Sequence, residues 1–324
     1  LRLAADVLRH PAFPADQFEQ LRLQAITGLE FQRNEPGTLA SMALSQYFDP
    51  WPVGHPLHVE SIDQSLARLK AITVEDIRAY HQAFYGSSVG EIAVVGDFDP
   101  VAMKAELQAL FADWKAPHAY APISTHYREV AARHERFSTP DKPNAVLLAR
   151  QNVSINLADA DFPALNIAIG ILGGDPLKAR LGERIRQKEG LSYNIGAGLS
   201  ADESRQGRDD NGSISIQAIA APENMAKLEA ALREELARLL ADGITAQELR
   251  DAVAEKKVAR EQSRAADAAI AGLLGDHLYY GRDMRFEAQR DAAYQALTVE
   301  QVNAAIRKHL KPEQLGVFVA GDFK

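Results

Sequence analysis

Two short segments of this chain recur at one common spacing, and this repeat constrains the fold more than any other feature. Ala71-Ile72-Thr73-Val74-Glu75 recurs 225 residues later as Ala296–Glu300, and Val94–Phe98 recurs at the same offset as Val319–Phe323. No gap separates the two matches, which a chance match of one short motif would not produce. Each copy predicts a helix with Thr at its N-terminal cap, a turn, and an apolar strand leading into Gly-Asp-Phe. The repeat therefore predicts two homologous domains in tandem.

The repeat also predicts where these domains lie. An upstream match of Phe13–Phe18 with Ile244–Leu249 aligns the beginning of the chain near residue 232. The prolines of Ala116–Pro122 disfavour a helix and predict a linker. Most of the region before residue 230 then has no counterpart in the first copy, so we expect that copy to be truncated and the chain to be a fragment. The predicted parts are the rear half of a first domain at 1–115, a linker at 116–122 and a complete second domain at 123–324.

Hydrophobic periodicity predicts how strands and helices are distributed. Ile214 and Ile216 alternate with polar residues, which is the pattern of a half-buried strand, and Leu177–Lys188 has the spacing of an amphipathic helix that ends at Gly190. The predicted strands are 90–96, 144–154, 191–201, 212–221 and 315–321. They are grouped among long helices and do not alternate with them one for one. This favours an α+β fold in which each domain is an antiparallel or mixed sheet packed with helices.

Composition excludes several classes of function. The 324 residues carry 36 Lys and Arg against 44 Asp and Glu, whereas a nucleic-acid-binding protein normally has a basic excess. The chain has no cysteine, which excludes thiol nucleophiles and cysteine-ligated metals. No stretch approaches the roughly 18 consecutive apolar residues that indicate a membrane span. We therefore expect neither nucleic acid nor a membrane as a partner.

Residues 173–193 carry a more specific signal. They contain Gly173-Gly174, then Ala179-Arg180-Leu181, then Arg186-Gln187-Lys188-Glu189-Gly190-Leu191-Ser192-Tyr193. This series resembles the second-domain signature of the insulinase/pitrilysin family of zinc metallopeptidases, the inverzincins. The first segment resembles the latter half of such a domain, from Pro11 through His55-Pro56 to Asp97. The resemblance covers nearly the whole chain and implies the carboxyl-terminal half of a longer multi-domain member.

The resemblance implies a role for two residues in the signature. In the family, an Arg and a Tyr seven residues apart reach from the second domain into the active site, and Arg186 and Tyr193 have this spacing. Both side chains can donate hydrogen bonds to a peptide carbonyl or to the oxyanion formed from it. They are therefore the predicted substrate-binding residues. From the residues alone, Arg186 as a solvated helix charge and Tyr193 as packing on a half-buried strand remain an alternative.

The family's metal site is missing from this sequence. His-x-x-Glu-His, which supplies two zinc ligands and the base that activates water, does not occur among the nine histidines. The position of the third ligand aligns with Gly28, although Glu30 lies close by. The resemblance thus implies no catalytic residue, no metal ligand and no cofactor in this chain, with zinc expected in a missing or partner domain. We expect the chain to be inactive by itself.

Three further patterns allow simpler interpretations. Arg180, Arg184, Arg186 and Lys188 form a basic cluster that is expected to be a solvated helix face. Gly196-Ala197-Gly198 predicts either a flat or edge strand on which a substrate backbone could lie, or a bulge. Asp209-Asp210-Asn211-Gly212 predicts a hairpin turn and not a calcium loop.

The sequence therefore favours the non-metal half of an insulinase-like zinc metallopeptidase. Its expected partners are a peptide or unfolded protein substrate and a zinc-bearing homologous half or subunit. The alternative is a non-catalytic structural or assembly subunit of the same fold, which would have no chemical reason to keep the Arg/Tyr pair. The cysteine-free composition and the family resemblance favour a periplasmic location.

Overall fold

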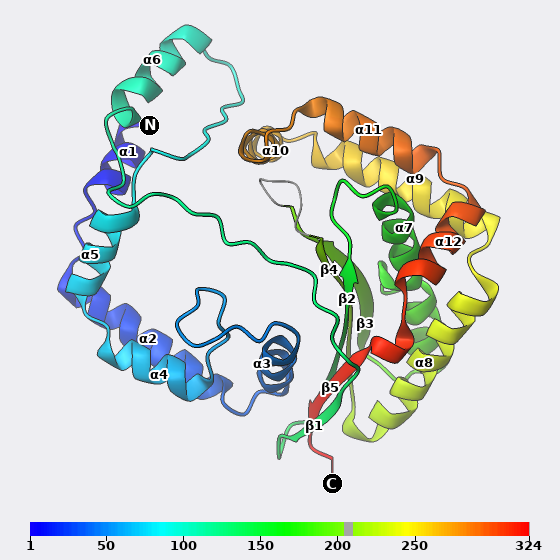
Figure 1. The fold of residues 1–324 in the computed structure, drawn as a ribbon. Coiled ribbons are helices and arrows are strands. Elements are labelled where there is room, and N and C mark those ends of the chain that lie inside the picture. Colours follow the sequence, from blue (N-terminus) through cyan, green and yellow to red (C-terminus); the bar gives the residue numbers. More distant parts are fainter. Residues whose placement is uncertain (204–209, 324) are drawn as a thin grey trace. The chain divides into compact units, whose positions relative to one another are not determined.

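The computed structural model describes residues 1–203 and 210–323, and the chain divides into two compact units (Figure 1). Unit 1 consists of Leu1–Gln32, Glu60–Ile123 and Ser263–Asp283. Unit 2 consists of Arg33–Val59, Ser124–Gln262 and Met284–Lys324. Each unit takes segments from both predicted copies of the repeat. The two units are defined by spatial contacts, whereas the domain boundaries were inferred from the sequence repeat; those boundaries stay a prediction.

Unit 1 is built from helices in the part of the chain that the structure describes. They are α1 (Arg2–Arg9), α2 (Ala15–Gln32), α4 (Ile62–Ala71), α5 (Val74–Phe84), α6 (Pro100–Phe111) and α10 (Asp267–Tyr280). Helix α5 begins with a capping box in which Thr73 and Asp76 satisfy each other's backbone N–H groups. Helix α12 (Val299–His309) of unit 2 begins in the same way, with Thr298 and Gln301. The Thr-capped helices predicted from the repeat are confirmed in both copies.

The strand predicted at 90–96 is wrong. The described residues of unit 1 contain no strand, and 90–96 is an irregular segment there. Its counterpart in the repeat is β5 (Gly316–Gly321), which pairs with a neighbouring strand on each side. The two segments have similar sequences, but only β5 has partners for its backbone N–H and C=O groups. An apolar segment without such partners does not become a strand.

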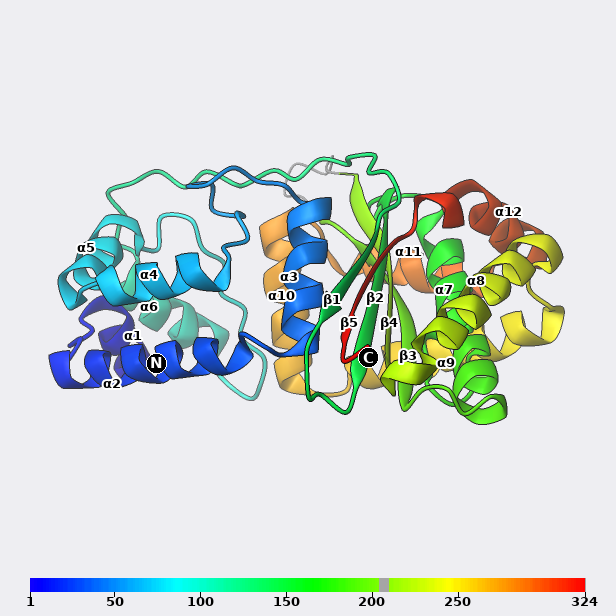
Figure 2. The same cartoon turned by 90° about the horizontal axis from the view of Figure 1, so that it is seen from below.

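Unit 2 contains a mixed five-stranded sheet, which confirms the α+β prediction. The strands are β1 (His134–Ser138), β2 (Ala145–Ser154), β3 (Asn194–Ala201), β4 (Asn211–Ala220) and β5 (Gly316–Gly321). Their order is β1-β5-β2-β4-β3, with β1 and β5 parallel and the other pairs antiparallel (Figure 2). The predicted pairing of 191–201 with 212–221 is confirmed. Strand β1 was not predicted, because His134, Glu135 and Arg136 do not form an apolar run.

One face of this sheet packs against helices and forms the main core. Helix α7 (Phe162–Gly173) lies on β3, and α11 (Met284–Gln295) and α12 pack on α7 (Figure 1). Helices α8 (Met225–Asp242) and α9 (Ala246–Ser263) belong to the same side. Alternate residues of β2, such as Leu147, and of β5, such as Val317, point into this core.

Helix α3 (Pro36–Phe48) covers part of the opposite face of the sheet. It packs against β5 and β2 and buries a second cluster around Phe48 and Phe318, whose ring centroids are 6.5 Å apart. Arg150 of β2 donates to Asp49, just beyond the end of α3, at 2.6 Å. Ser215 and Gln217 of β4 are exposed on this same face, so α3 leaves the β3–β4 part of the sheet uncovered. None of the described helices is long and apolar enough to cross a membrane.

We expect Phe48→Ala to lower the free energy of unfolding of unit 2 by about 3–5 kcal/mol, because it removes a fully buried ring from between α3 and β5. Phe31→Ala, which removes a ring that is 74% exposed in α2, is the matched control, with an expected change of about 0.5 kcal/mol or less. Urea unfolding of the two variants measures both effects. Equal changes would show that α3 does not stabilise the sheet.

Candidate functional site

The signature segment does not form the single helix predicted over 177–188. Residues 174–179 are turns and bends, and the winding from Gly182 to Lys188 is that of a π-helix, η1. The Asp175 carboxylate accepts the backbone N–H groups of Leu177 and Lys178, at 2.7 and 2.9 Å, and so favours a turn over a helix. A Cβ at Gly182 would lie 2.3 Å from the carbonyl oxygen of Pro176. The turn at residues 174–179 therefore packs against Gly182, where a larger side chain would collide with the backbone of Pro176.

The turn between η1 and β3 is fixed by its backbone. Gly190 has φ +62°, a conformation that glycine adopts at low cost, and it reverses the chain at the end of η1. Beyond it, the Leu191 N–H donates to the Ile185 carbonyl at 2.9 Å and the Tyr193 N–H donates to the Ile219 carbonyl at 2.9 Å. Buried Ser192 donates its hydroxyl to the Ile219 carbonyl at 2.9 Å. The path from Arg186 to Tyr193 is thus bonded to η1 at one end and to β4 at the other.

The two predicted substrate-binding residues lie on the surface of unit 2. Arg186 is exposed on η1, next to Ile185, which is buried in the core. Tyr193 is 66% exposed at the beginning of β3, which does not match the alternative of a packed sheet residue. Within 1–203 and 210–323, neither the Arg186 guanidinium nor the Tyr193 hydroxyl has a hydrogen-bond or ion-pair partner, and no contact joins them. Both polar groups therefore remain available to another molecule.

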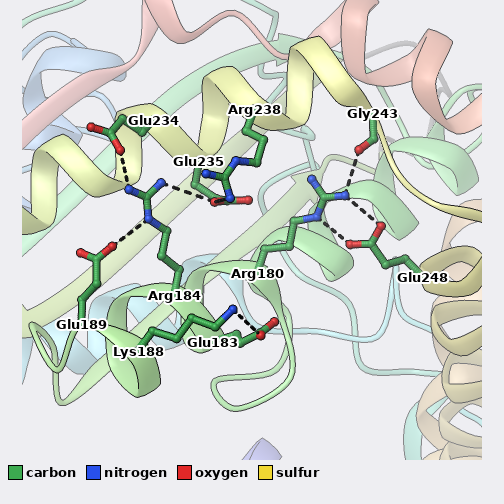
Figure 3. A network of polar contacts seen from close by, with 10 residues as sticks. All are labelled: Arg180, Glu183, Arg184, Lys188, Glu189, Glu234, Glu235, Arg238, Gly243 and Glu248. Atoms are coloured by element: carbon green, nitrogen blue, oxygen red, sulfur yellow. Dashed lines mark hydrogen bonds and ion pairs between the residues drawn. The ribbon is translucent and has the colours of Figure 1, made fainter.

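Arg180 and Arg184 do not belong to a solvated face, contrary to expectation, whereas Lys188 does. Figure 3 shows Arg180 and Arg184 directed toward carboxylates of other elements, whereas Lys188 pairs with Glu183 of η1 itself. The side chains of Arg180 and Arg184 are largely buried. The expectation failed because their partners are distant in the sequence, and helical spacing alone does not reveal them. Among these four cations, only Arg186 is exposed and has no partner among the described residues.

Arg184 bridges three carboxylates. Its Nε donates to Glu189 at 2.9 Å, Nη2 donates to Glu234, and Nη1 lies 3.6 Å from Glu235 (Figure 3). Glu235 on α8 is almost fully buried and also lies 3.5 Å from Arg238. Hydrogen bonds to Glu234 and Glu189 raise the pKa of the Arg184 guanidinium above its ordinary value. One side chain therefore joins the end of η1 to α8.

Arg180 anchors the beginning of the same segment. Its Nε and Nη2 donate to the two oxygens of Glu248 at 2.6 and 2.8 Å, and Nη2 also donates to the Gly243 carbonyl at 2.9 Å. Glu248 caps α9 as well, by accepting the Thr245 N–H at 2.7 Å. Burial raises the pKa of the Glu248 carboxyl, but the hydrogen bonds from Arg180 and Thr245 outweigh burial, so the pKa lies below its ordinary value.

Strand β3 forms one edge of the sheet, as one of the two interpretations of Gly196-Ala197-Gly198 expected. Gly196 and Gly198 pair in regular register with Gln217 and Ser215, so the alternative of a bulge is wrong. A pocket of about 440 Å³ lies over these residues, between the edge strand and Leu44 of α3. The segment that carries Tyr193 thus leads directly into an open part of the sheet.

The residues present do not fit a zinc site. Among residues 1–203 and 210–323, no three His, Asp or Glu side chains converge as metal ligands would, and the sequence lacks His-x-x-Glu-His. Of the predicted hairpin turn, Asp209 lies outside the described residues, while Asn211 and Gly212 already belong to β4. No step that depends on a metal is therefore assigned to side chains of this chain.

Comparisons with known proteins agree with this arrangement. The family model described as the peptidase M16 inactive domain matches residues 71–256, more than half of the chain. An uncharacterised zinc protease of Mycobacterium leprae is 24% identical over 343 residues, which cover 99% of this chain and 70% of that protein. The crystal structure of a peptidase M16 inactive domain from Pseudomonas fluorescens is similar with a TM-score of 0.80 and 27% identity, over 98% of this chain and 73% of that one.

A third similarity concerns the fold alone. The periplasmic protease PqqL from Escherichia coli is similar with a TM-score of 0.69 and 17% identity, over 94% of this chain and 33% of that protein. The fold and the signature segment thus define an insulinase-like domain without a metal site among its described residues. The chain belongs to the peptidase M16 family, matched by the family's inactive domain, which confirms the resemblance found in the sequence.

The Arg180–Glu248 pair predicts how stability depends on pH. Because the pKa of Glu248 is lowered in the folded state, its contribution is present above the pKa of about 4.3 of an unfolded glutamate, and it is lost as the pH falls through the folded-state pKa. Glu248→Gln should cost about 1–3 kcal/mol at pH 7 and flatten the fall of unfolding free energy below pH 4.5. Urea unfolding from pH 7 to pH 3 measures this, with exposed Glu255→Gln on α9 as the control. Parallel pH profiles for wild type and Glu248→Gln would contradict the assignment.

Proposed function

We propose that this chain is the non-catalytic half of an M16 zinc metallopeptidase and that it binds and orients peptide substrate through Arg186 and Tyr193. One observation carries the proposal. In a segment where Arg180, Arg184 and Lys188 are all paired within the chain, Arg186 is exposed and has no partner among the described residues. Tyr193, at the other end of the same turn, is equally exposed. A guanidinium and a phenol left open in this way are donors for a ligand.

The chemistry of the two side chains suits a peptide. The guanidinium offers several N–H donors in a planar fork, and the phenol offers one O–H donor. Both can donate to the carbonyl oxygen of a peptide, and both bonds strengthen as that oxygen acquires negative charge during attack by water. In this function the chain holds the carbonyl and its developing charge, while the zinc and the general base are supplied by a homologous half.

The zinc-bearing half in this proposal is an earlier domain of the same polypeptide or a partner subunit. The Escherichia coli protease, of which this chain covers 33%, is an example of a similar fold within a much longer chain. The proposal includes the tandem arrangement predicted from the repeat, with domain boundaries at 1–115, 116–122 and 123–324. It also includes the periplasmic location, which agrees with the cysteine-free sequence and with the location of that periplasmic protease.

Arg186→Ala and Tyr193→Phe are each expected to lower kcat/KM for a quenched fluorogenic peptide by about 10²–10³, measured in the zinc-loaded assembly of this chain with its zinc-bearing half. Each variant removes one donor to the carbonyl oxygen, and both side chains are exposed. Arg307→Ala on α12 and Tyr80→Phe on α5 change exposed side chains of the same types and should leave turnover unchanged. Normal turnover in both test variants would instead favour the structural or assembly subunit.

By itself, this chain should bind no stoichiometric zinc and hydrolyse no peptide, because its sequence lacks the ligand pair and the general base of the family. Metal analysis after dialysis against Zn²⁺, together with a fluorogenic peptide assay on the same sample, measures both properties. The zinc-loaded assembly is the positive control. Stoichiometric zinc in the isolated chain would show that it carries a metal site of its own.

A further inference from the structure

We propose that Arg184 is the positioning residue of this site: it fixes the turn that carries Arg186 and Tyr193, and thereby sets the affinity for peptide. This inference rests on the proposed function and assigns to Arg184 a role that is distinct from contact with substrate. The guanidinium lies at the end of η1, with two of its carboxylate partners on α8 and the third at Glu189. Its side chain is only 17% exposed, so it is not itself available to a ligand.

Arg184 acts on the turn through Glu189. Glu189 is the last residue before Gly190, at which the chain reverses, and its own N–H donates to the Arg184 carbonyl at 3.0 Å. Arg184 therefore holds Glu189 twice, once through the backbone and once through the side-chain bond of 2.9 Å. Arg186 lies three residues before Glu189 and Tyr193 four residues after it. A shift of Glu189 would move both donors relative to each other.

The α8 end of the bridge is rigid. Glu235 is buried on the core side of α8, next to Leu232 and Leu236, which are also buried. A carboxylate in such a place is held in position by its charged neighbours, here Arg184 and Arg238. The pair of Glu234 with Arg184 adds a second tie to the same helix. Arg184 thus connects the turn to the core of unit 2 through α8. The positions of the Arg186 and Tyr193 side chains therefore do not depend on the turn alone.

The anchored segment is a π-helix. This winding is rare, occurs mostly as single turns and is frequent at functional sites. Residues Gly182–Lys188 adopt it between the turn that packs over Gly182 and the reversal at Gly190. Hydrogen bonds from Arg180, just before this segment, and from Arg184, within it, connect it to α9, to α8 and to Glu189.

Glu189→Gln tests the inference most sharply, because it weakens the tie between Arg184 and the turn and leaves the pairs with α8 intact. Glu183→Gln is the matched control: it removes the same charge from the same segment, but among the described residues the Glu183 side chain pairs only with Lys188, at 2.8 Å and in solvent. Arg184→Lys keeps the charge that buried Glu235 requires, so the fold persists, but an ammonium cannot span three carboxylates as a guanidinium does.

The measurement is the affinity of the full chain for fluorescein-labelled β-casein, an unfolded polypeptide, by fluorescence anisotropy. Glu189→Gln and Arg184→Lys should each weaken binding on the order of tenfold, and Glu183→Gln should not. In a background that carries both Arg186→Ala and Tyr193→Phe, Glu189→Gln should have no further effect, because a positioning residue acts only through the donors that it places. Hydrogen exchange at the Leu191 amide should accelerate in Glu189→Gln and Arg184→Lys, while exchange in β4 stays as in wild type.

Each outcome decides the matter. If Arg186→Ala weakens binding and Glu189→Gln does not, the positioning role is overturned and the proposed function stands. If Glu189→Gln weakens binding by the same factor in the background that carries both Arg186→Ala and Tyr193→Phe as in wild type, Arg184 acts on stability alone, and the inference fails. If Arg186→Ala and Tyr193→Phe both bind β-casein as wild type does, or if the wild type does not bind it, the proposed function fails and the inference fails with it.

Discussion

Burial of strand β5 on both faces of the sheet of unit 2 is the constraint on which the rest of the structure depends. Strand β5 shows it most clearly, since all of its residues are buried: Val317 and Val319 belong to the main core, and Phe318 and Ala320 belong to the second cluster under α3. A short apolar strand of this kind is stable only when it is paired on both sides and covered from above and below. Helix α3 supplies the second cover over β5 and β2, while β3 and β4 remain open on that face.

The sequence predicted this fold where the signal is local. Thr73 and Thr298 cap helices in both copies because the capping box needs only residues three positions apart. Alternation along 212–221 identified β4 for the same reason. The prediction failed where pairing over long distances decides the structure. Residues 90–96 have the composition of a strand without a partner in their unit, and β1 is polar but is paired by β5.

The candidate site shows the same division. The seven-residue spacing singled out Arg186 and Tyr193, and the structure places both on the surface of unit 2. The spacing does not show that Arg184, two residues earlier, is largely buried and paired, whereas Arg186 is exposed. The difference arises because Glu234 and Glu235 reach Arg184 from a helix about fifty residues away in the chain. The acidic residues of 225–242 indicate that this helix can pair with a cation. Without knowledge of the topology, they do not indicate which arginine is the partner.

The ion pairs and hydrogen bonds of Arg180 and Arg184 also affect how well the proposed substrate-binding surface resists proteolysis. A protease cleaves a chain that has locally straightened into an extended form, so loops that open by themselves are cut first. The segment from Arg180 to Tyr193 is bound to the α8–α9 turn, to α8 and to β4, and it cannot straighten without disturbing the core of unit 2. The surface proposed to bind substrate is in this way protected from proteolysis.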